Sequence, residues 1–128
     1  MIPKDLRYHQ EHEWVRLSGM QATVGISHFA QDALGDIVFI DMPKLGAVVM
    51  AGQQIGEVES TKTTSTIYTP VSGTIAKVNA DLNDHPEVVN SDPYGKGWMV
   101  MIDLLSASDV EKLMTAAEYE AFLASQKH

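Results

Sequence analysis

Residues 56–73 read GEVESTKTTSTIYTPVSG and predict a β-hairpin that carries one lysine at its tip. Apolar residues mark a strand on each side, and between Ser60 and Thr66 every residue except Lys62 is small and hydroxylated. Two strands joined by a short polar connection form a hairpin, and connections of this kind lie at the surface. The segment therefore presents the amine of Lys62 on a stiff support with no other charge beside it. This arrangement favours a lysine that is acylated and used as a tether.

The composition indicates one globular domain with an acidic surface. The chain has 128 residues and a hydrophobic content of 45%, which are ordinary values for a domain with its own core. Its formal net charge of −8 comes from 17 Asp plus Glu against nine Lys plus Arg, a balance that repels nucleic-acid backbones. There is no cysteine, so sulfur redox chemistry would need an attached group. We therefore expect a single domain over residues 1–128 that does not bind nucleic acid.

The sequence contains no apolar run of membrane-spanning length. Residues 1–5 show neither the apolar core of a signal peptide nor an Arg-rich amphipathic presequence. We expect a monomer of the bacterial cytoplasm without a membrane partner. A mitochondrial location would require that a presequence had been removed.

Most of the chain predicts short strands separated by turns. Ser27 is expected to cap a short helix over residues 28–34, which ends at Gly35. The strand over residues 36–42 has four consecutive apolar residues and is expected to be buried on both faces. Residues 79–97 contain several Pro, Gly, Asp and Asn and predict a loop. The predicted strands cover residues 14–17, 22–26, 36–42, 47–50, 54–59, 73–78 and 98–102, with one more directly after Lys62.

The C-terminal part changes to a helical pattern. Capping-box sequences that begin at Ser108 and Thr115 predict two short helices. The expected fold class is mainly β: a sandwich of antiparallel sheets over about residues 13–103, a short helix in the N-terminal half, and helices over residues 106–125. The apolar residues expected on the buried faces of the two C-terminal helices are Val110, Leu113, Met114, Tyr119, Phe122 and Leu123.

The hairpin resembles the lipoyl-bearing domains, because Glu59 precedes Lys62 by three residues and Gly73 follows it by eleven. Over nearly its whole length the chain is more closely similar to the H-protein family of the glycine cleavage system. The segments that carry this resemblance are His12-Glu13-Trp14, Gly25-Ile26, Ala30-Gln31, Leu34-Gly35-Asp36, Val38-Phe39, Glu59-Ser60-Thr61-Lys62, the stretch from Tyr68 to Gly73, Val89-Asn90, Pro93-Tyr94 and Gly97-Trp98. The resemblance implies a barrel-sandwich hybrid of the lipoyl-domain type.

The resemblance also implies a carrier rather than an enzyme. Lipoic acid would be joined by an amide to Lys62 and would carry the aminomethyl group of glycine. The implied partners are the pyridoxal-phosphate-dependent glycine decarboxylase (P protein), the tetrahydrofolate-dependent aminomethyltransferase (T protein) and dihydrolipoyl dehydrogenase (L protein), which reoxidises the arm. A lipoate-attaching enzyme would be a fourth partner.

The family pattern further implies roles for residues around the lysine. Glu59 and Gly73 would be recognised during lipoylation. Glu13, which we expect at the surface of the unloaded protein, would contact the loaded arm. The family usually has Asp four residues after the lysine, where this chain has Thr66. The loss of that carboxylate predicts weaker docking of the loaded arm.

Other carriers and a cofactor-free protein are the alternatives. Lipoyl domains of 2-oxoacid dehydrogenase complexes tend to have Asp-Lys-Ala at the tip and biotin carriers Met-Lys-Met, whereas this chain has Thr61-Lys62-Thr63. A lipoate relay protein, which passes lipoate to other carriers, is compatible with Thr66. An unmodified β-sandwich interaction module is the alternative from another class. The sequence shows no catalytic constellation, and His9 and His12 lack the spacing of a helical metalloprotease site.

Overall fold

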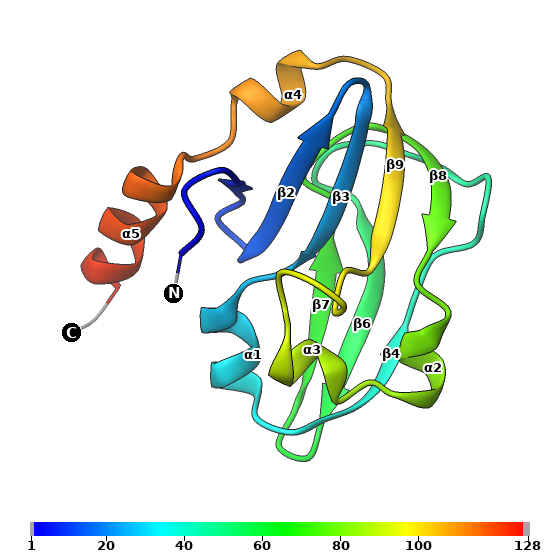
Figure 1. Ribbon diagram of the computed structural model, residues 1–128, viewed down its shortest axis with the longest axis vertical. Helices are drawn as coiled ribbons and strands as arrows, with labels where there is room; N and C mark the ends of the chain where they lie inside the picture. The colour runs from blue at the N-terminus through cyan, green and yellow to red at the C-terminus, as the bar shows by residue number, and fades with distance from the viewer. Residues whose placement is uncertain (1, 127–128) are drawn as a thin grey trace.

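Two antiparallel sheets form the body of the molecule (Figure 1). The computed structural model describes residues 2–126. Within that range the larger sheet contains, in spatial order, β1 (Arg7–Tyr8), β2 (Glu13–Ser18), β3 (Gln21–Ile26), β9 (Val100–Leu104), β8 (Gly73–Val78) and β5 (Val48–Val49). The smaller sheet contains β4 (Ile37–Asp41), β6 (Gln54–Ser60) and β7 (Thr64–Tyr68), with β6 in the middle. The predicted fold class, mainly β with antiparallel sheets, is confirmed.

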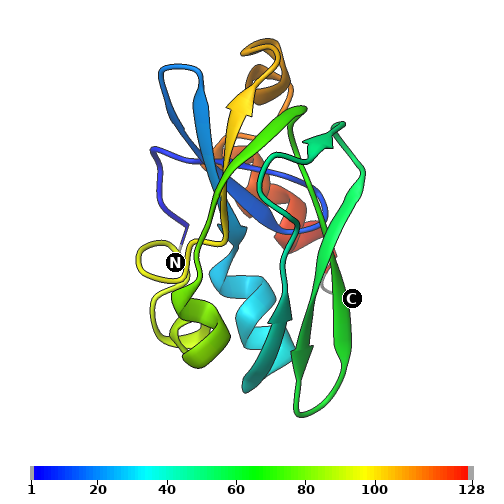
Figure 2. The same cartoon turned by 90° about the vertical axis from the view of Figure 1, so that its right-hand side faces the viewer.

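The helices are short and lie around the sheets. They are α1 (His28–Leu34), α2 (Asp81–Asp84), α3 (Val88–Ser91), α4 (Ser108–Glu111) and α5 (Ala116–Ser125). Figures 1 and 2 show α1 and α3 at the same end of the molecule as the turn between β6 and β7. Helix α5 lies at the far side of the larger sheet, next to β1.

The core joins the facing sides of the two sheets. Aliphatic side chains from both sheets form one buried cluster, because strands alternate between inward and outward residues. Its members include Val24, Ile75 and Ile102 from the larger sheet and Ile40, Val58 and Ile67 from the smaller one. A second cluster holds α5 against the outer strands of the larger sheet. In that cluster the rings of Tyr8 and Tyr119 stack with centroids 4.5 Å apart.

Two of the predicted helix starts are confirmed. The Ser27 hydroxyl accepts a hydrogen bond from Ala30 N at 3.2 Å, so Ser27 caps α1. Thr115 and Glu118 form the complete reciprocal capping box at the start of α5. In both places the cap satisfies backbone N–H groups that have no partner within the helix.

The structure corrects three predictions. The strand after α1 is not buried on both faces: Val38 is 49% and Phe39 54% exposed, because β4 is an edge strand whose register shifts between Ile37 and Phe39. Residues 79–97 are not wholly loop, because α2 and α3 form there as single helical turns that bury Leu82 and Val89.

The third correction concerns α4. Ser108 does not cap this helix; Ala107 occupies the cap position without a side-chain hydrogen bond, and the Ser108 N–H bonds to the Ser106 hydroxyl instead. Strand β1, which pairs with β2, was not predicted at all, since two residues carry too little pattern.

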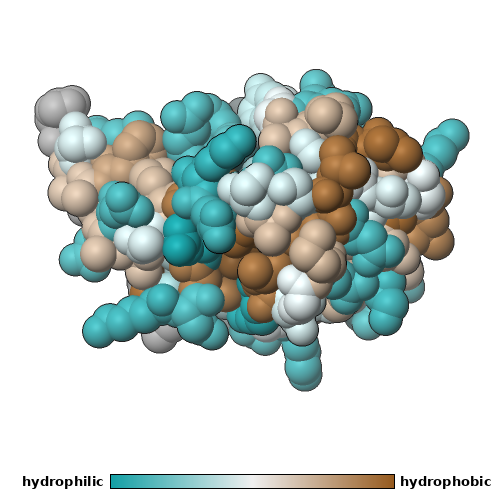
Figure 3. All heavy atoms as spheres, turned by 90° about the horizontal axis from the view of Figure 1, so that it is seen from above, coloured by the Kyte–Doolittle hydropathy of each residue, from teal (hydrophilic) through white to brown (hydrophobic). Residues whose placement is uncertain are grey.

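The end of the molecule away from the β6–β7 turn is partly apolar. Figure 3 views this end and shows several apolar side chains on its surface. Met20, Met50 and Leu105 are 53%, 56% and 71% exposed, and they follow or precede strands that meet at this end. In the described part of the chain, no helix combines the length and apolar character needed to cross a membrane.

Candidate functional site

The β6–β7 hairpin ends in a tight turn that the side chain of Ser60 stabilises by hydrogen bonds. Glu59 and Thr64 form the last registered pair, and Ser60 N then donates to Thr63 O at 2.8 Å. The buried Ser60 hydroxyl accepts from the N–H groups of Lys62 and Thr63, both at 3.1 Å. A serine side chain that binds the backbone two and three residues on stabilises a turn. Lys62 therefore occupies a defined position at the tip.

Lys62 is exposed, as the hairpin pattern predicts. The ion pairs found among residues 2–126 join His9 to Glu13 and His85 to Glu87, and neither involves Lys62. An amine without a carboxylate partner remains available to an acylating enzyme. The arrangement can serve as an attachment point for a group that visits other proteins.

The tip is not an isolated stalk, because its backbone is bonded to the corner between α1 and β4. Thr61 N donates to Asp36 O at 3.0 Å. On the other side of this corner, the Asn90 amide donates to Gly35 O at 2.8 Å and accepts from Ile37 N at 2.9 Å. Sequence analysis missed Asn90 as a support of the site, because it lies far from Lys62 in the chain. We call residues 34–37 the α1–β4 corner.

Glu59 and Gly73 occupy very different environments. Glu59 is exposed beside the tip and pairs with Phe39 and Thr64 in the sheet. Gly73 is buried at the start of β8, and Figure 1 shows that this strand begins at the other end of the molecule. A Cβ at Gly73 would collide with the backbone oxygen of Asp103 and lie 2.7 Å from Ile102 Cγ2. The close approach of β8 and β9 therefore accounts for this glycine.

Glu13 is buried, and the expectation that it lies at the surface is wrong: only 1% of it is exposed. Its carboxylate accepts a hydrogen bond from Tyr68 N at 3.0 Å and lies 3.0 Å from His9 Nδ1. Burial raises the pKa of Glu13, while the hydrogen bonds from His9 and Tyr68 act in the opposite direction. Because Glu13 is on β2 and Tyr68 on β7, this carboxylate links the two sheets.

Thr66, at the position where the family usually has Asp, has an acidic neighbour across the hairpin. Glu57 pairs directly with Thr66, and both residues are half-buried. Side chains of directly opposed residues project from the same face of a sheet. A carboxylate is thus present next to position 66, supplied by the other strand. The sequence pattern alone did not reveal this neighbour, because the pairing depends on the register of the hairpin.

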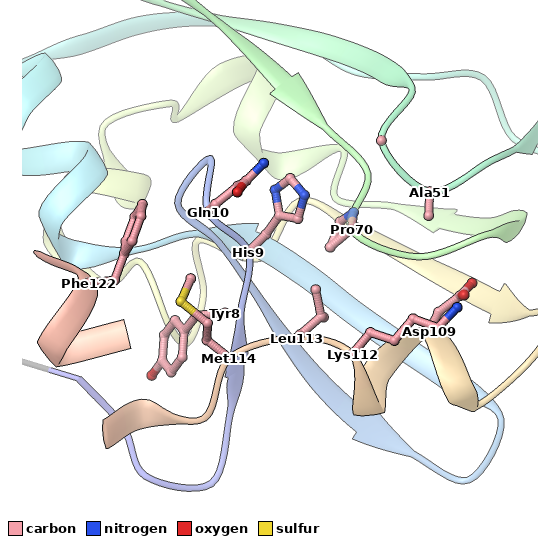
Figure 4. A pocket seen from close by; sticks show the side chains of 11 residues that line it. Tyr8, His9, Gln10, Ala51, Pro70, Asp109, Lys112, Leu113, Met114 and Phe122 are labelled. Carbon is pink, nitrogen blue, oxygen red and sulfur yellow. The ribbon is translucent and has the colours of Figure 1, made fainter. Parts of the chain in front are cut away.

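A cavity on the described surface lies away from Lys62. It has a volume of about 440 Å³ and is shown in Figure 4. Side chains from the N-terminal segment, Pro70 and the connection between α4 and α5 surround it, among them His9, Lys112 and Met114. Lys62 does not line it. Among residues 2–126, no three His, Cys, Asp or Glu side chains are grouped so that they could hold a metal ion.

Comparison with known proteins identifies the family. The family model described as glycine cleavage H-protein matches residues 6–126. The glycine cleavage system H protein of Bacillus subtilis (strain 168) is 55% identical over 119 residues, which cover 93% of this chain and 94% of that protein. The corresponding protein of Geobacillus kaustophilus (strain HTA426) is 50% identical over 121 residues, covering 94% and 95%.

A solved structure agrees with these matches. The crystal structure of a glycine cleavage system H protein from Mycobacterium marinum superposes with a TM-score of 0.89 at 40% identity, covering 96% of this chain and 99% of that one. The matches extend over almost the whole chain and accord with two antiparallel sheets that present an exposed lysine at a hairpin tip. This chain belongs to the glycine cleavage H-protein family, whose members are non-catalytic lipoyl carriers of the glycine cleavage system.

Proposed function

We propose that Lys62 carries lipoic acid through an amide bond and that the chain shuttles the aminomethyl group of glycine between enzymes. The group would be received at the pyridoxal-phosphate-dependent glycine decarboxylase and delivered to the tetrahydrofolate-dependent aminomethyltransferase. Dihydrolipoyl dehydrogenase would then reoxidise the reduced arm. The observation that carries the proposal is the exposed Lys62, without an ion pair among the described residues, on a fastened hairpin in a chain of this family.

The chemistry divides between the group and the protein. When attached, the dithiolane of lipoate supplies the sulfur chemistry, which this chain lacks because it has no cysteine. The protein supplies a fixed point of attachment: Ser60 closes the turn, and Asp36 holds Thr61 in place. Acylation also removes the positive charge of Lys62, since an amide nitrogen is not protonated at neutral pH.

The surroundings of Lys62 can serve as the address for the lipoate-attaching enzyme. Glu59 is exposed next to the tip, and its cross-strand neighbour Phe39 is 54% exposed. An acidic group and an aromatic ring therefore lie close to the target amine. Gly73 contributes to lipoylation through the packing of β8 against β9, which supports the sheets that carry the hairpin.

Two carboxylates are the candidates for contact with the loaded arm. Glu57 faces Thr66 and supplies a negative charge where the residue four positions after Lys62 has none. Glu13 could bind the cationic aminomethyl group only if it exchanged the contacts that it makes with His9 and Tyr68. Charge-assisted hydrogen bonds to a carboxylate are the interactions that would retain such an amine. We further propose that the chain is a single domain, acts as a monomer and resides in the bacterial cytoplasm.

Intact-mass measurement of the chain from a lipoylating host tests the attachment. The wild type is expected to gain the mass of one lipoyl group, and Lys62→Arg is expected to gain none. Lys44→Arg, which alters an exposed lysine in a turn, is the matched control and should be modified like the wild type. A wild-type chain that stays unmodified would contradict the carrier function and favour a cofactor-free interaction module.

A reconstitution separates glycine cleavage from lipoate relay. The lipoylated chain is combined with glycine, tetrahydrofolate and the three partner enzymes, and release of carbon dioxide is followed. Release that depends on Lys62 is the expected result. If lipoate passes from this chain to other carriers while no carbon dioxide is released, the relay function is the better account.

A further inference from the structure

Gly35 ends helix α1 in a conformation that other residues rarely adopt. Its backbone has φ 80° and ψ −153°. This region of backbone space is populated almost only by glycine. The helix stop therefore explains why residue 35 is glycine, but it does not explain what lies on top of it.

The stem of Lys62 lies directly on Gly35. A Cβ at Gly35 would be 2.8 Å from Lys62 Cε, 3.5 Å from Nζ and 3.9 Å from Cδ. Real Cβ atoms essentially never approach another heavy atom closer than 3.0 Å. Lys62 Cε thus occupies the space that a Cβ at position 35 would fill, and Nζ and Cδ lie at ordinary van der Waals distance from it.

The other glycines with positive φ show that this contact is particular to Gly35. Gly19, Gly46 and Gly52 have φ values of 60°, 82° and 90°, and nothing lies within 4 Å of the Cβ position of any of them. A positive φ alone therefore does not bring a side chain over a glycine in this chain. The contact at Gly35 depends on where the hairpin tip is held.

Hydrogen bonds hold both partners of the contact in place. On the hairpin side, Thr61 N is bonded to Asp36 O, next to Gly35. On the helix side, Asn90 Nδ2 donates to Gly35 O at 2.8 Å and to Gln31 Oε1 at 2.9 Å. The α1–β4 corner and the tip cannot move apart without breaking the bond between Thr61 N and Asp36 O. The lysine stem lies over this supported corner, although Lys62 remains exposed.

We propose that Gly35 is a positioning residue for Lys62: it offers a surface without a side chain on which the lysine stem rests, so that a group joined to Nζ starts from the α1–β4 corner. The inference rests on the proposed function, because it concerns the base of the acylated arm. A lysine has a long, flexible stem with high rotamer entropy. An enzyme that binds the arm meets a stem that is already ordered, which reduces the entropy lost on binding.

The unmodified chain gives the first test, which does not depend on lipoylation. In NMR spectra of the isotope-labelled chain, a nuclear Overhauser effect is expected between the Lys62 Hε and Gly35 Hα protons. The side-chain order parameter of Lys62 should exceed that of the exposed Lys44. Gly35→Ala should lower it to the Lys44 value. Gly46→Ala, which is matched in φ and has nothing within 4 Å of its Cβ position, should leave it unchanged.

The lipoylated chain gives the second test. In the glycine decarboxylase reaction, Gly35→Ala should raise the KM for the carrier roughly 2- to 12-fold, the factor expected for ordering one flexible side chain on binding, with kcat unchanged. Gly46→Ala should keep the wild-type KM. If Gly35 contributed only to stability, KM would not rise in a variant that circular dichroism shows to be folded.

The outcomes separate the inference from the proposed function. If the wild type is lipoylated but shows no Lys62–Gly35 Overhauser effect, or if the KM of Gly35→Ala does not rise, the positioning role is wrong and the carrier function stands. If the wild type is never lipoylated, the carrier function fails, while the Overhauser effect still decides whether Gly35 orders Lys62. Should Gly35→Ala not fold, the wild-type spectrum alone settles the contact.

Discussion

Asn90 holds the corner on which the hairpin tip rests, and Asn90→Ala tests how much this corner contributes to stability. The substitution removes hydrogen bonds to Ile37 N, Gln31 Oε1 and Gly35 O, which measure 2.9, 2.9 and 2.8 Å. A neutral hydrogen bond contributes about 0.5–1.5 kcal/mol net, so the sum is roughly 1.5–4.5 kcal/mol.

Two effects reduce this sum. Asn90 is only half-buried, so water can replace part of what is lost. Alanine also favours the helical turn of α3 by up to ~0.7 kcal/mol over asparagine. We therefore expect the free energy of unfolding to fall by about 2 kcal/mol. For a chain of 128 residues this corresponds to a decrease in Tm of roughly 6–10 °C.

Urea unfolding followed by circular dichroism measures this loss. Asn83→Ala is a matched control, because Asn83 is exposed and is the third residue of the four-residue helix α2, just as Asn90 is the third residue of the four-residue helix α3. The control should change the free energy of unfolding by less than ~0.5 kcal/mol. Equal effects of the two substitutions would refute the reasoning that Asn90 holds the α1–β4 corner.

Three further predictions follow from the buried carboxylate, the glycine of β8 and the helix caps. Because burial raises the pKa of Glu13 above its unfolded value of 4.5, the folded chain keeps this proton to higher pH, and the free energy of unfolding should fall as pH rises through the folded pKa. Glu13→Gln should remove that fall. If urea unfolding of Glu13→Gln shows the same pH profile as the wild type, this reasoning is wrong. Gly73→Ala should lower the free energy of unfolding by about 1–3 kcal/mol or more, because the new Cβ would collide with Asp103 O. Lipoylation of this variant should decline only as far as its folded fraction does. Normal stability with lost lipoylation would instead show that the attaching enzyme recognises Gly73 directly. Thr115→Ala should lower the free energy of unfolding by about 1 kcal/mol because it removes the cap of α5, whereas Ser108→Ala should change it by less than ~0.5 kcal/mol. Calorimetry that shows a larger effect for Ser108→Ala would refute the cap assignment.

Local patterns were sufficient for several parts of this molecule. The β6–β7 hairpin, the exposed Lys62 and the caps at Ser27 and Thr115 depend on residues within a few positions of one another. Such interactions are specified by residue types at fixed spacing, which a sequence displays directly. The same reasoning misplaced the cap of α4, where Ala107 occupies the cap position and the Ser108 N–H bonds to the Ser106 hydroxyl.

Contacts between distant parts of the chain decided the rest. Only the packing of the two sheets brings Tyr68 N to Glu13, which turns a residue expected at the surface into a buried link. Likewise, the position of β4 at a sheet edge exposes Phe39, and Asn90 reaches the α1–β4 corner across more than fifty residues. The amino-acid sequence by itself determined which lysine lies at the tip of a hairpin and what kind of turn carries it. The tertiary structure alone decided what that lysine rests on, because Gly35 meets Lys62 only after long-range hydrogen bonds have joined a helix end to a hairpin.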